Sequence, residues 1–215
     1  GNRVEIAIEF ANFHSRRAEV FQPPVLTDRS NFERRFVFQN FIAMVVNGIF
    51  LFLFFYYLIL FALNRKYPEH LFFALFTLSL FVREAARGGE IFSTALAGIP
   101  WEWKYAVWLL IIPVQLFTYN GFIAGVFPQE SNRYVFRGLA GFAVAYAIFC
   151  IAAPPRLFTG TLLLPQIVAL FFGVYILWLL ITAIRRGRAK AWLLIVASAV
   201  LFAAVINDTL YSHGL

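Results

Sequence analysis

The sequence predicts an all-α integral membrane protein. Of its 215 residues, 61% are hydrophobic and only 13% are charged, whereas soluble domains have about 45–50% apolar and about 25% charged residues. Twenty-seven side chains are phenylalanine, too many for the core of one small soluble domain. Six apolar segments follow one another along the chain, each near the ~20 residues that cross a ~30 Å hydrocarbon core. Because a spanning helix keeps its backbone hydrogen bonds within its own segment, we expect a helical bundle.

Residues 1–36 are predicted to lie outside the membrane. Residues 3–10 alternate polar and apolar side chains with a period of two, which is typical of a β-strand. A lone strand buries nothing on its own, so we interpret it as the last strand of an extramembrane sheet whose other strands lie upstream. The chain from Gly1 would then be part of a longer protein. Proline and small polar residues over 22–31 indicate a turn and a linker.

Residues 37–215 are predicted to form the transmembrane helix bundle. The six predicted spans cover residues 38–63, 69–87, 103–126, 134–153, 157–184 and 189–211. Pro113 and Pro165 fall inside the third and fifth spans. A proline inside a helix lacks an amide N–H and its ring clashes with the preceding turn, so we expect a helix kink at both positions.

Small residues recur at helical spacing in the fourth and sixth predicted spans. These residues are Gly138, Gly141, Ala145, Ala199 and Ala203. Because small side chains let two helices approach closely within a membrane, this spacing predicts helix packing at both faces.

The positions of the cations predict the orientation of the bundle. The loop between the last two spans contains Arg185, Arg186, Arg188 and Lys190, and an excess of Lys and Arg is typical of cytoplasmic loops. That side of the membrane holds eight cations against four, although six further arginines in the N-terminal segment reverse the total. Segments of translocated domains obey the rule poorly, so we place the N-terminus outside the cytoplasm. We expect the four loop cations to contact anionic lipid headgroups at the inner face.

Polar side chains inside the predicted spans form the candidate site, because each needs a partner or water within lipid. The rise of a helix places them at similar depth, in the outer leaflet. This predicted outer-leaflet polar cluster consists of Asn47, Arg83, Glu84, Arg87, Gln166, Asn207 and Asp208. Asp208 paired with Arg83 or Arg87 would line a small polar cavity. Alternatively, the charged residues from Arg83 to Glu90 lie at the outer interface and satisfy one another.

The sequence has no catalytic motif, so we expect no enzyme. It contains no metalloprotease helix, no glycine-flanked nucleophilic serine and no phosphate-binding glycine loop. His70 and His213 are separated by the thickness of the membrane, which argues against a shared metal or haem. Glu130, beside the helix-ending Pro128, and Asp208 belong to opposite leaflets and form no catalytic carboxylate pair. We therefore expect no cofactor and no metal, and no basic helix face indicates nucleic acid as a partner.

Several short motifs, taken in order, resemble a known family. They are VEIAI at residues 4–8, NFHSRR at 12–17, FFYY at 54–57, NRK at 64–66, LFFALF at 71–76, FPQE at 127–130 and INDTLY at 206–211, with Gly214. Their order and spacing resemble the membrane module of the bacterial seven-transmembrane receptors with diverse intracellular signalling modules. The N-terminal pair resembles the closing strand of that family's extracellular sensor domain.

The resemblance implies a function in signalling. Members have an extracytoplasmic sensor domain, for which the family suggests a carbohydrate ligand, then seven helices and a cytoplasmic output domain. The chain would then show six helices of a seven-helix bundle, preceded by a β-strand remnant of the sensor domain. We expect it to relay a signal from an extracytoplasmic ligand or partner across the bacterial cytoplasmic membrane, to a cytoplasmic signalling domain or a partner complex in the membrane.

Two other functions stay open. One is a non-catalytic structural or accessory subunit packed against a larger membrane complex, which nothing in the sequence excludes. The other is a small-solute transporter or channel, which needs polar residues at the midplane and often has repeated halves. Their positions within the spans place the polar residues only near the two membrane faces, and no repeat relates the first three spans to the last three.

Overall fold

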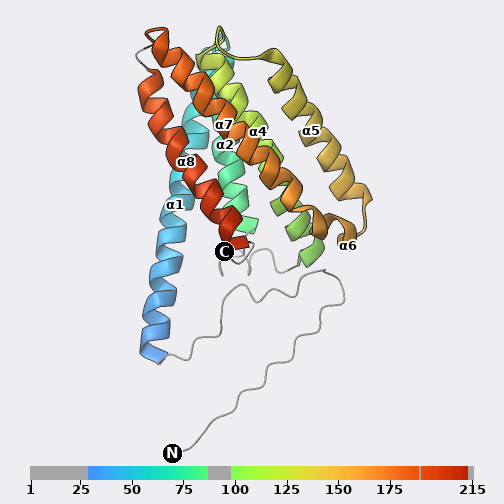
Figure 1. Ribbon diagram of the computed structural model, residues 1–215. Helices are drawn as coiled ribbons and strands as arrows, with labels where there is room; N and C mark the ends of the chain where they lie inside the picture. The colour runs from blue at the N-terminus through green and yellow to red at the C-terminus, as the bar shows by residue number, and fades with distance from the viewer. Residues whose placement is uncertain (1–28, 87–97, 189, 213–215) are drawn as a thin grey trace, which may run out of the picture.

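The chain forms helices throughout the residues that the computed structural model describes, which are 29–86, 98–188 and 190–212. The helices are α1 (Arg29–Leu63), α2 (Pro68–Ala86), α4 (Trp101–Val126), α5 (Arg133–Ala152), the short α6 (Pro155–Phe158), the 3-10 turn η1 (Thr159–Thr161), α7 (Leu163–Arg185) and α8 (Ala191–Ser212) (Figure 1). These described ranges contain no strand, which confirms the all-α class. The strand predicted over residues 3–10 lies outside them, so the sensor-domain remnant gains no support.

Four helices are long and apolar enough to cross a membrane. Within the described residues these stretches are Asn40–Leu63, Glu102–Val126, Arg133–Ala152 and Leu163–Arg185. Helix α8 adds a shorter apolar stretch, Ala191–Asn207. Helix α2 has charged residues at both ends, Glu69 near its start and Arg83 near its end. The length and composition of these helices make the chain a multi-pass membrane protein.

Two boundaries differ from the predicted spans. Helix α1 begins at Arg29, within the stretch predicted as a linker, because the small polar residues that favour turns also favour helix starts. The predicted fifth span divides into α6, η1 and α7, so α7 begins only at Leu163. Pro165 therefore lies in the first turn of α7, where its missing N–H leaves no helical bond unmade. The kink predicted at Pro165 is wrong, whereas Pro113 lies inside α4 as expected.

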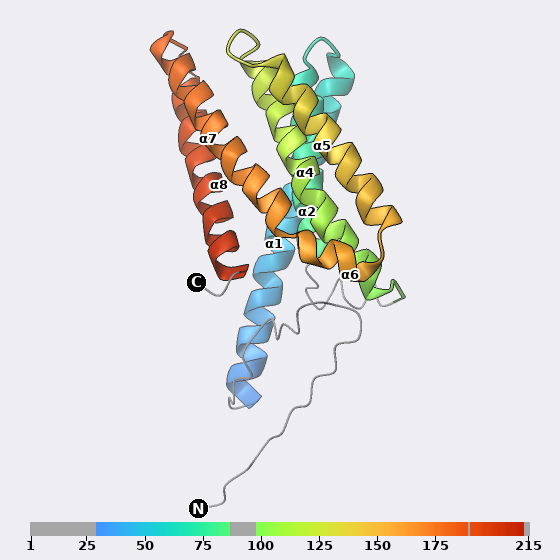
Figure 2. The ribbon, with the colours of Figure 1, turned by 45° about the vertical axis from the view of Figure 1, so that its right-hand side comes forward.

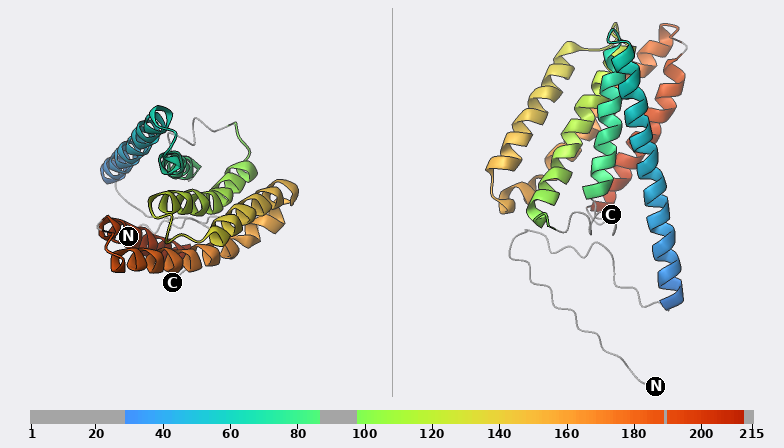
Figure 3. Two further views of the ribbon diagram at one scale, coloured as in Figure 1. Left: turned by 90° about the horizontal axis from the view of Figure 1, so that it is seen from above. Right: turned by 180° about the vertical axis from the view of Figure 1, so that it is seen from behind.

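Helix α4 occupies the centre of the bundle. It packs most extensively against α2 and also contacts α5 and α7, while α1 packs on α2 and α8 packs on α7 (Figures 2 and 3). The bundle thus consists of a four-helix group (α1, α2, α4 and α5) and an α7–α8 pair. Ile123 of α4 and Ile176 and Leu179 of α7 lie in the apolar core between the two parts. The loops α1–α2, α4–α5 and α7–α8 meet at one end, which we call the three-loop end (top of Figure 1).

Two glycines of α4 allow its close contact with α2. A Cβ at Gly121 would overlap the ring of Phe72, and a Cβ at Gly125 would lie 2.6 Å from the Cβ of Glu69. Gly121 and Gly125 are four residues apart and so lie on the same face of α4, a spacing that is typical of closely packed membrane helices. The two glycines therefore set the distance between α2 and α4.

The small residues predicted to pack helices together lie elsewhere. A Cβ at Gly138 or Gly141 would meet nothing within 4 Å. Ala145 of α5 and Ala199 and Ala203 of α8 are exposed in the described part of the bundle. The packing predicted at these positions is therefore wrong within the fold, because the faces that bear them point away from the neighbouring helices.

Candidate functional site

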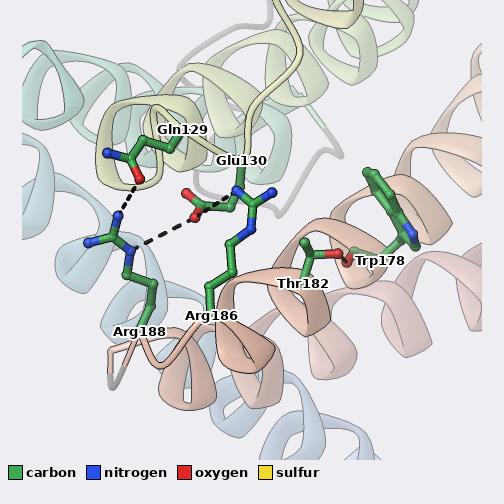
Figure 4. A network of polar contacts seen from close by, with 6 residues as sticks. All are labelled: Gln129, Glu130, Trp178, Thr182, Arg186 and Arg188. Carbon is green, nitrogen blue, oxygen red and sulfur yellow. Dashed lines mark hydrogen bonds and ion pairs between the residues drawn. The ribbon is translucent and has the colours of Figure 1, made fainter.

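A charged network at the three-loop end joins the two parts of the bundle. It consists of Gln129, Glu130, Arg186 and Arg188, and we call it the Glu130 network (Figure 4). Its acidic half follows α4, where Pro128 prevents the helix from continuing. The N–H of Phe127 still donates to the carbonyl of Ile123 at 2.8 Å, and the N–H of Glu130 donates back to the carbonyl of Phe127 at 3.2 Å. This tight turn places Glu130 against the bundle, where its side chain is only 1% exposed.

The basic half of the network follows α7, which ends at a glycine. Gly187 has φ +76, in the left-handed region that glycine adopts without steric cost. Its N–H donates to the carbonyl of Ile184 at 2.9 Å, and the N–H of Arg188 donates to that of Ala183 at 3.1 Å. This pair of bonds is the Schellman ending of a helix. The turn presents Arg186 and Arg188, on either side of the glycine, to the same carboxylate.

The bonds of the network leave one oxygen of the carboxylate unused. The Nη1 of Arg186 donates to Glu130 Oε1 at 3.5 Å, and the Nε of Arg188 lies 3.8 Å from the same oxygen. Arg188 also donates through Nη2 to Gln129 Oε1 at 2.6 Å. Both arginine side chains are about half exposed. Glu130 Oε2 is buried and has no hydrogen-bond partner among the described residues.

Two further hydrogen bonds join the same two parts. The N–H of Asn132, in the α4–α5 loop, donates to the hydroxyl of Tyr175 in α7 at 3.1 Å. Deeper in the bundle, the hydroxyls of Tyr119 in α4 and Ser198 in α8 are 2.6 Å apart. The Ser198 hydroxyl donates to the carbonyl of Leu194 at 2.6 Å. Its single proton is therefore engaged, and Tyr119 is the donor between the helices.

Replacing Tyr119 with phenylalanine tests the second of these bonds. We expect Tyr119→Phe to lower the free energy of unfolding in detergent by about 0.6 kcal/mol, and by no more than about 1.7 kcal/mol, because hydrogen bonds between membrane helices contribute that little. Tyr56→Phe is the matched control, since Tyr56 is exposed on α1. An equal loss in both variants would mean that the hydroxyl of Tyr119 contributes nothing specific.

Three members of the predicted outer-leaflet cluster lie in different surroundings within the structure. Asn47 is buried in α1, and its Nδ2 donates to the carbonyl of Ala43 within the same helix at 2.8 Å. Arg83 donates through Nη1 to Gln115 Oε1 of α4 at 3.5 Å. Gln166 is buried in α7.

Of the remaining members of this cluster, the structure describes the side chains of only two. Glu84 is half-buried in α2, and Asn207 is exposed on α8. Arg87 and the side chain of Asp208 lie outside the described part of the chain. The pairing of Asp208 with Arg83 or Arg87 therefore stays a prediction.

Sequence analysis missed the polar residues in the interior of the bundle. Thr77 and Ser79 of α2 and Gln115, Thr118 and Asn120 of α4 are all buried. The inference that polar groups lie only near the two faces is therefore wrong. The hydroxyls of Thr77, Ser79 and Thr118 donate to carbonyls of their own helices, which satisfies them locally. The signal available in sequence was the presence of polar residues on both helices well inside their apolar stretches.

Glu130 was also missed as a site residue, although its place at the end of α4 was predicted. Its partners lie 56 or more residues away in sequence, so no local pattern reveals the pairing. The available signal was one carboxylate in the FPQE motif, facing the same side of the membrane as a loop with four cations.

No group of three or more His, Cys, Asp or Glu in the described ranges could hold a metal ion. The site is therefore a structural tie between two groups of helices.

Comparison with known proteins identifies a family. A family model described as 7TM diverse intracellular signalling matches residues 39–215. The matched region starts within α1 and includes all the later helices and the whole Glu130 network. No curated protein and no solved structure matches the chain.

Proposed function

Since the chain belongs to the 7TM diverse intracellular signalling family, we propose that it relays a signal from an extracytoplasmic ligand or partner across the bacterial cytoplasmic membrane. The match over residues 39–215 confirms the resemblance to the membrane module of this family. Together with the apolar helices, it makes the chain a membrane module of a signalling receptor. We take the six long helices as six spans of the seven-helix bundle of this family.

The charges support an orientation with the three-loop end in the cytoplasm. Eight cations belong to this end: Arg65, Lys66, Arg133, Arg137, Arg185, Arg186, Arg188 and Lys190. Cytoplasmic loops have such an excess of Lys and Arg, so we place the start of α1 on the extracytoplasmic side. The exposed cations of the last loop would then contact anionic headgroups in the inner leaflet.

The Glu130 network is the observation on which the proposed relay depends. The α7–α8 pair meets α4 mainly through an apolar surface, so few directional bonds oppose a shift of the pair. Glu130 with Arg186, Asn132 with Tyr175, and Tyr119 with Ser198 are polar ties across this boundary. A signal would favour one of two positions of the pair relative to the four-helix group. A ligand can shift the equilibrium between these two positions only by the difference between its affinities for them.

We propose no catalytic role and no cofactor for the chain itself. Its output would pass to a cytoplasmic signalling domain or to a partner complex in the membrane. The competing function is a structural or accessory subunit, which differs from a relay in one physical property. A relay needs two arrangements of its helices, whereas a packing subunit needs only one.

Distance measurements between spin labels distinguish these two functions. Labels would be attached to cysteines at Arg137 of α5 and Trp192 of α8, which are exposed on the two parts of the bundle. Cys150, the one native cysteine, is buried and would be replaced by alanine. In lipid nanodiscs we expect two populated distances. Gln115→Leu removes one hydrogen-bond acceptor of Arg83 inside the bundle, and we expect it to change the ratio of the two distances. Gln115 lies about 16 Å from Val126 along α4, at 1.5 Å per residue.

Labels at Arg137 and Tyr67 provide the control, since both sites are exposed and belong to the four-helix group or its loop. Their distance should stay single and unchanged by Gln115→Leu. One narrow distance between Arg137 and Trp192, the same with and without Gln115→Leu, would reject the relay and favour the accessory subunit.

A further inference from the structure

A cavity of about 810 Å³ opens at the three-loop end beside the Glu130 network. Its walls come from the end of α1, the start of α2, the end of α4 and the α7–α8 loop. The side chains that matter chemically are Tyr57, Glu69, His70, Glu130, Arg188 and Lys190. These residues come from segments far apart in sequence, so the cavity is a product of the fold.

Glu130, in the wall of this cavity, has a carboxylate oxygen without a hydrogen-bond partner among the described residues. Its side chain is 1% exposed, and Oε2 has no hydrogen-bond partner among the described residues. Nδ1 of His70, in the wall formed by α2, is likewise buried without a described partner. Buried polar atoms are nearly always hydrogen-bonded in native proteins, so these two atoms in the walls of one cavity are candidates for hydrogen bonds from a bound molecule. A ligand that donates N–H groups would satisfy Oε2.

The charges in the wall specify a ligand with both signs of charge. Glu69 and Glu130 are two carboxylates, and Arg188 and Lys190 are two cations. A simple anion would be repelled by the carboxylates, and a simple cation would be repelled by Arg188 and Lys190. A molecule with a phosphate at one end and an ammonium at the other would pair with both. The ring of Tyr57 adds an aromatic face, which attracts primary and quaternary ammonium groups alike.

The depth of the cavity matches that of lipid headgroups. Tyr57 lies six residues before the end of α1 at Leu63, or ~9 Å along the helix. Glu69 is the second residue of α2, and Glu130 follows α4 after a short turn. The polar layer of a bilayer extends roughly 5–7 Å beyond each side of the hydrocarbon core. The cavity therefore lies where a phosphate and an ammonium of a phospholipid are at high local concentration.

We propose that this cavity binds a phosphate ester bearing a primary ammonium, as in the headgroup of phosphatidylethanolamine. The phosphate would lie against Lys190 and Arg188, and the ammonium would donate to Glu130 Oε2 and pair with Glu69. The site shares Glu130 and Arg188 with the network on which the proposed relay depends, but binding does not require a relay, because a rigid accessory subunit could hold the same ligand. A free phospho-amine has the same chemistry as the headgroup, so the test must distinguish the two sources.

Lipid titration of the purified chain, followed by native mass spectrometry, tests this site. The probes are phosphatidylethanolamine and phosphatidylcholine with identical acyl chains. Phosphatidylcholine has the same charges but no ammonium N–H to donate. We expect phosphatidylethanolamine to bind about tenfold more tightly, the lower end of what a hydrogen bond to a charged group contributes. Glu130→Gln and Glu69→Gln should reduce this ratio toward one, and Lys190→Met should weaken both lipids equally.

The matched controls are Glu102→Gln, at the other end of α4, and Lys66→Met, an exposed cation at the same end that does not line the cavity. Neither should change the ratio or the affinities. Lys190 is exposed, so its replacement should leave the thermal midpoint unchanged and keeps the test valid if a Glu130 variant unfolds.

Two outcomes would overturn the proposal: equal binding of the two lipids, or a preference that persists in both Glu130→Gln and Glu69→Gln. Competition with soluble O-phosphoethanolamine identifies the source of the ligand. Displacement of the lipid at equimolar concentration would reject the lipid as the source and assign the site to a free phospho-amine. Failure to displace it would support the headgroup.

Discussion

Replacing Arg186 and Arg188 together by methionine is expected to lower the free energy of unfolding by about 3 kcal/mol. The reason is that the carboxylate of Glu130, only 1% exposed, would lose both of its cationic partners. Removing one side of a buried ion pair leaves an uncompensated buried charge, which costs about 3–5 kcal/mol. We expect the lower end of that range, because both arginine side chains are about half exposed, so water already screens part of their attraction to Glu130. Reversible unfolding in mixed detergent micelles would measure the loss.

Removing the carboxylate should cost far less than removing the arginines. The side chains of Arg186 and Arg188 are 56% and 48% exposed, so both can turn to water when Glu130 is replaced. We expect Glu130→Gln to cost about 1 kcal/mol or less, as for an exposed ion pair. A triple variant that combines Glu130→Gln with the replacement of both arginines should then recover most of the stability that the double arginine variant loses.

The matched control for the double variant replaces Arg65 and Arg137 by methionine. Both are exposed cations at the three-loop end, and the double replacement changes the net charge by the same amount. Its stability should change by less than about 0.5 kcal/mol, as is usual for surface substitutions. If both double variants lose equal stability, or if the triple variant recovers nothing, the Glu130 network does not hold the two parts together.

Some features of the Glu130 network can be predicted from the sequence alone, and others cannot. Hydropathy predicts where α4 and α7 cross the membrane, because length and apolar composition determine that. Proline chemistry also predicts that α4 ends near Pro128, and the structure ends it at Val126. Whether Glu130 then points to water or into the bundle depends on the turn after Phe127 and on the Schellman ending at Gly187. The two segments meet only in three dimensions, so their pairing could not be predicted.

The side of each helix that packs against its neighbours could not be predicted from the sequence either. In a soluble helix, polar residues mark the exposed side, but in a membrane both the lipid-facing and the packed sides are apolar. Gly138 and Gly141 therefore look as suitable for helix contact as Gly121 and Gly125. The structure packs only the second pair against α2. The interior polar residue Asn120, fully buried in α4, is hidden in the same way, because its surroundings depend on which face α4 turns inward.

Replacing Gly125 with alanine is expected to destabilise the contact between α2 and α4. The new Cβ would lie 2.6 Å from the Cβ of Glu69 and 3.2 Å from its Cα. A backbone atom cannot swing away as a side chain can, so α2 itself would have to move. Overpacking of this kind typically costs about 1–3 kcal/mol, and we expect Gly125→Ala to lower the free energy of unfolding in micelles by that amount.

Gly138→Ala makes the same chemical change where a Cβ would meet nothing within 4 Å. Alanine has a higher helix propensity than glycine by about 1 kcal/mol in water, so this variant should be as stable as the parent or more stable. The opposite signs of the two changes separate steric packing from helix propensity, because propensity alone would stabilise both. A gain in stability with Gly125→Ala would mean that α2 and α4 do not approach as closely as the glycines allow. A loss confined to Gly125→Ala would locate the tight contact of the four-helix group at this residue, one residue before the end of α4.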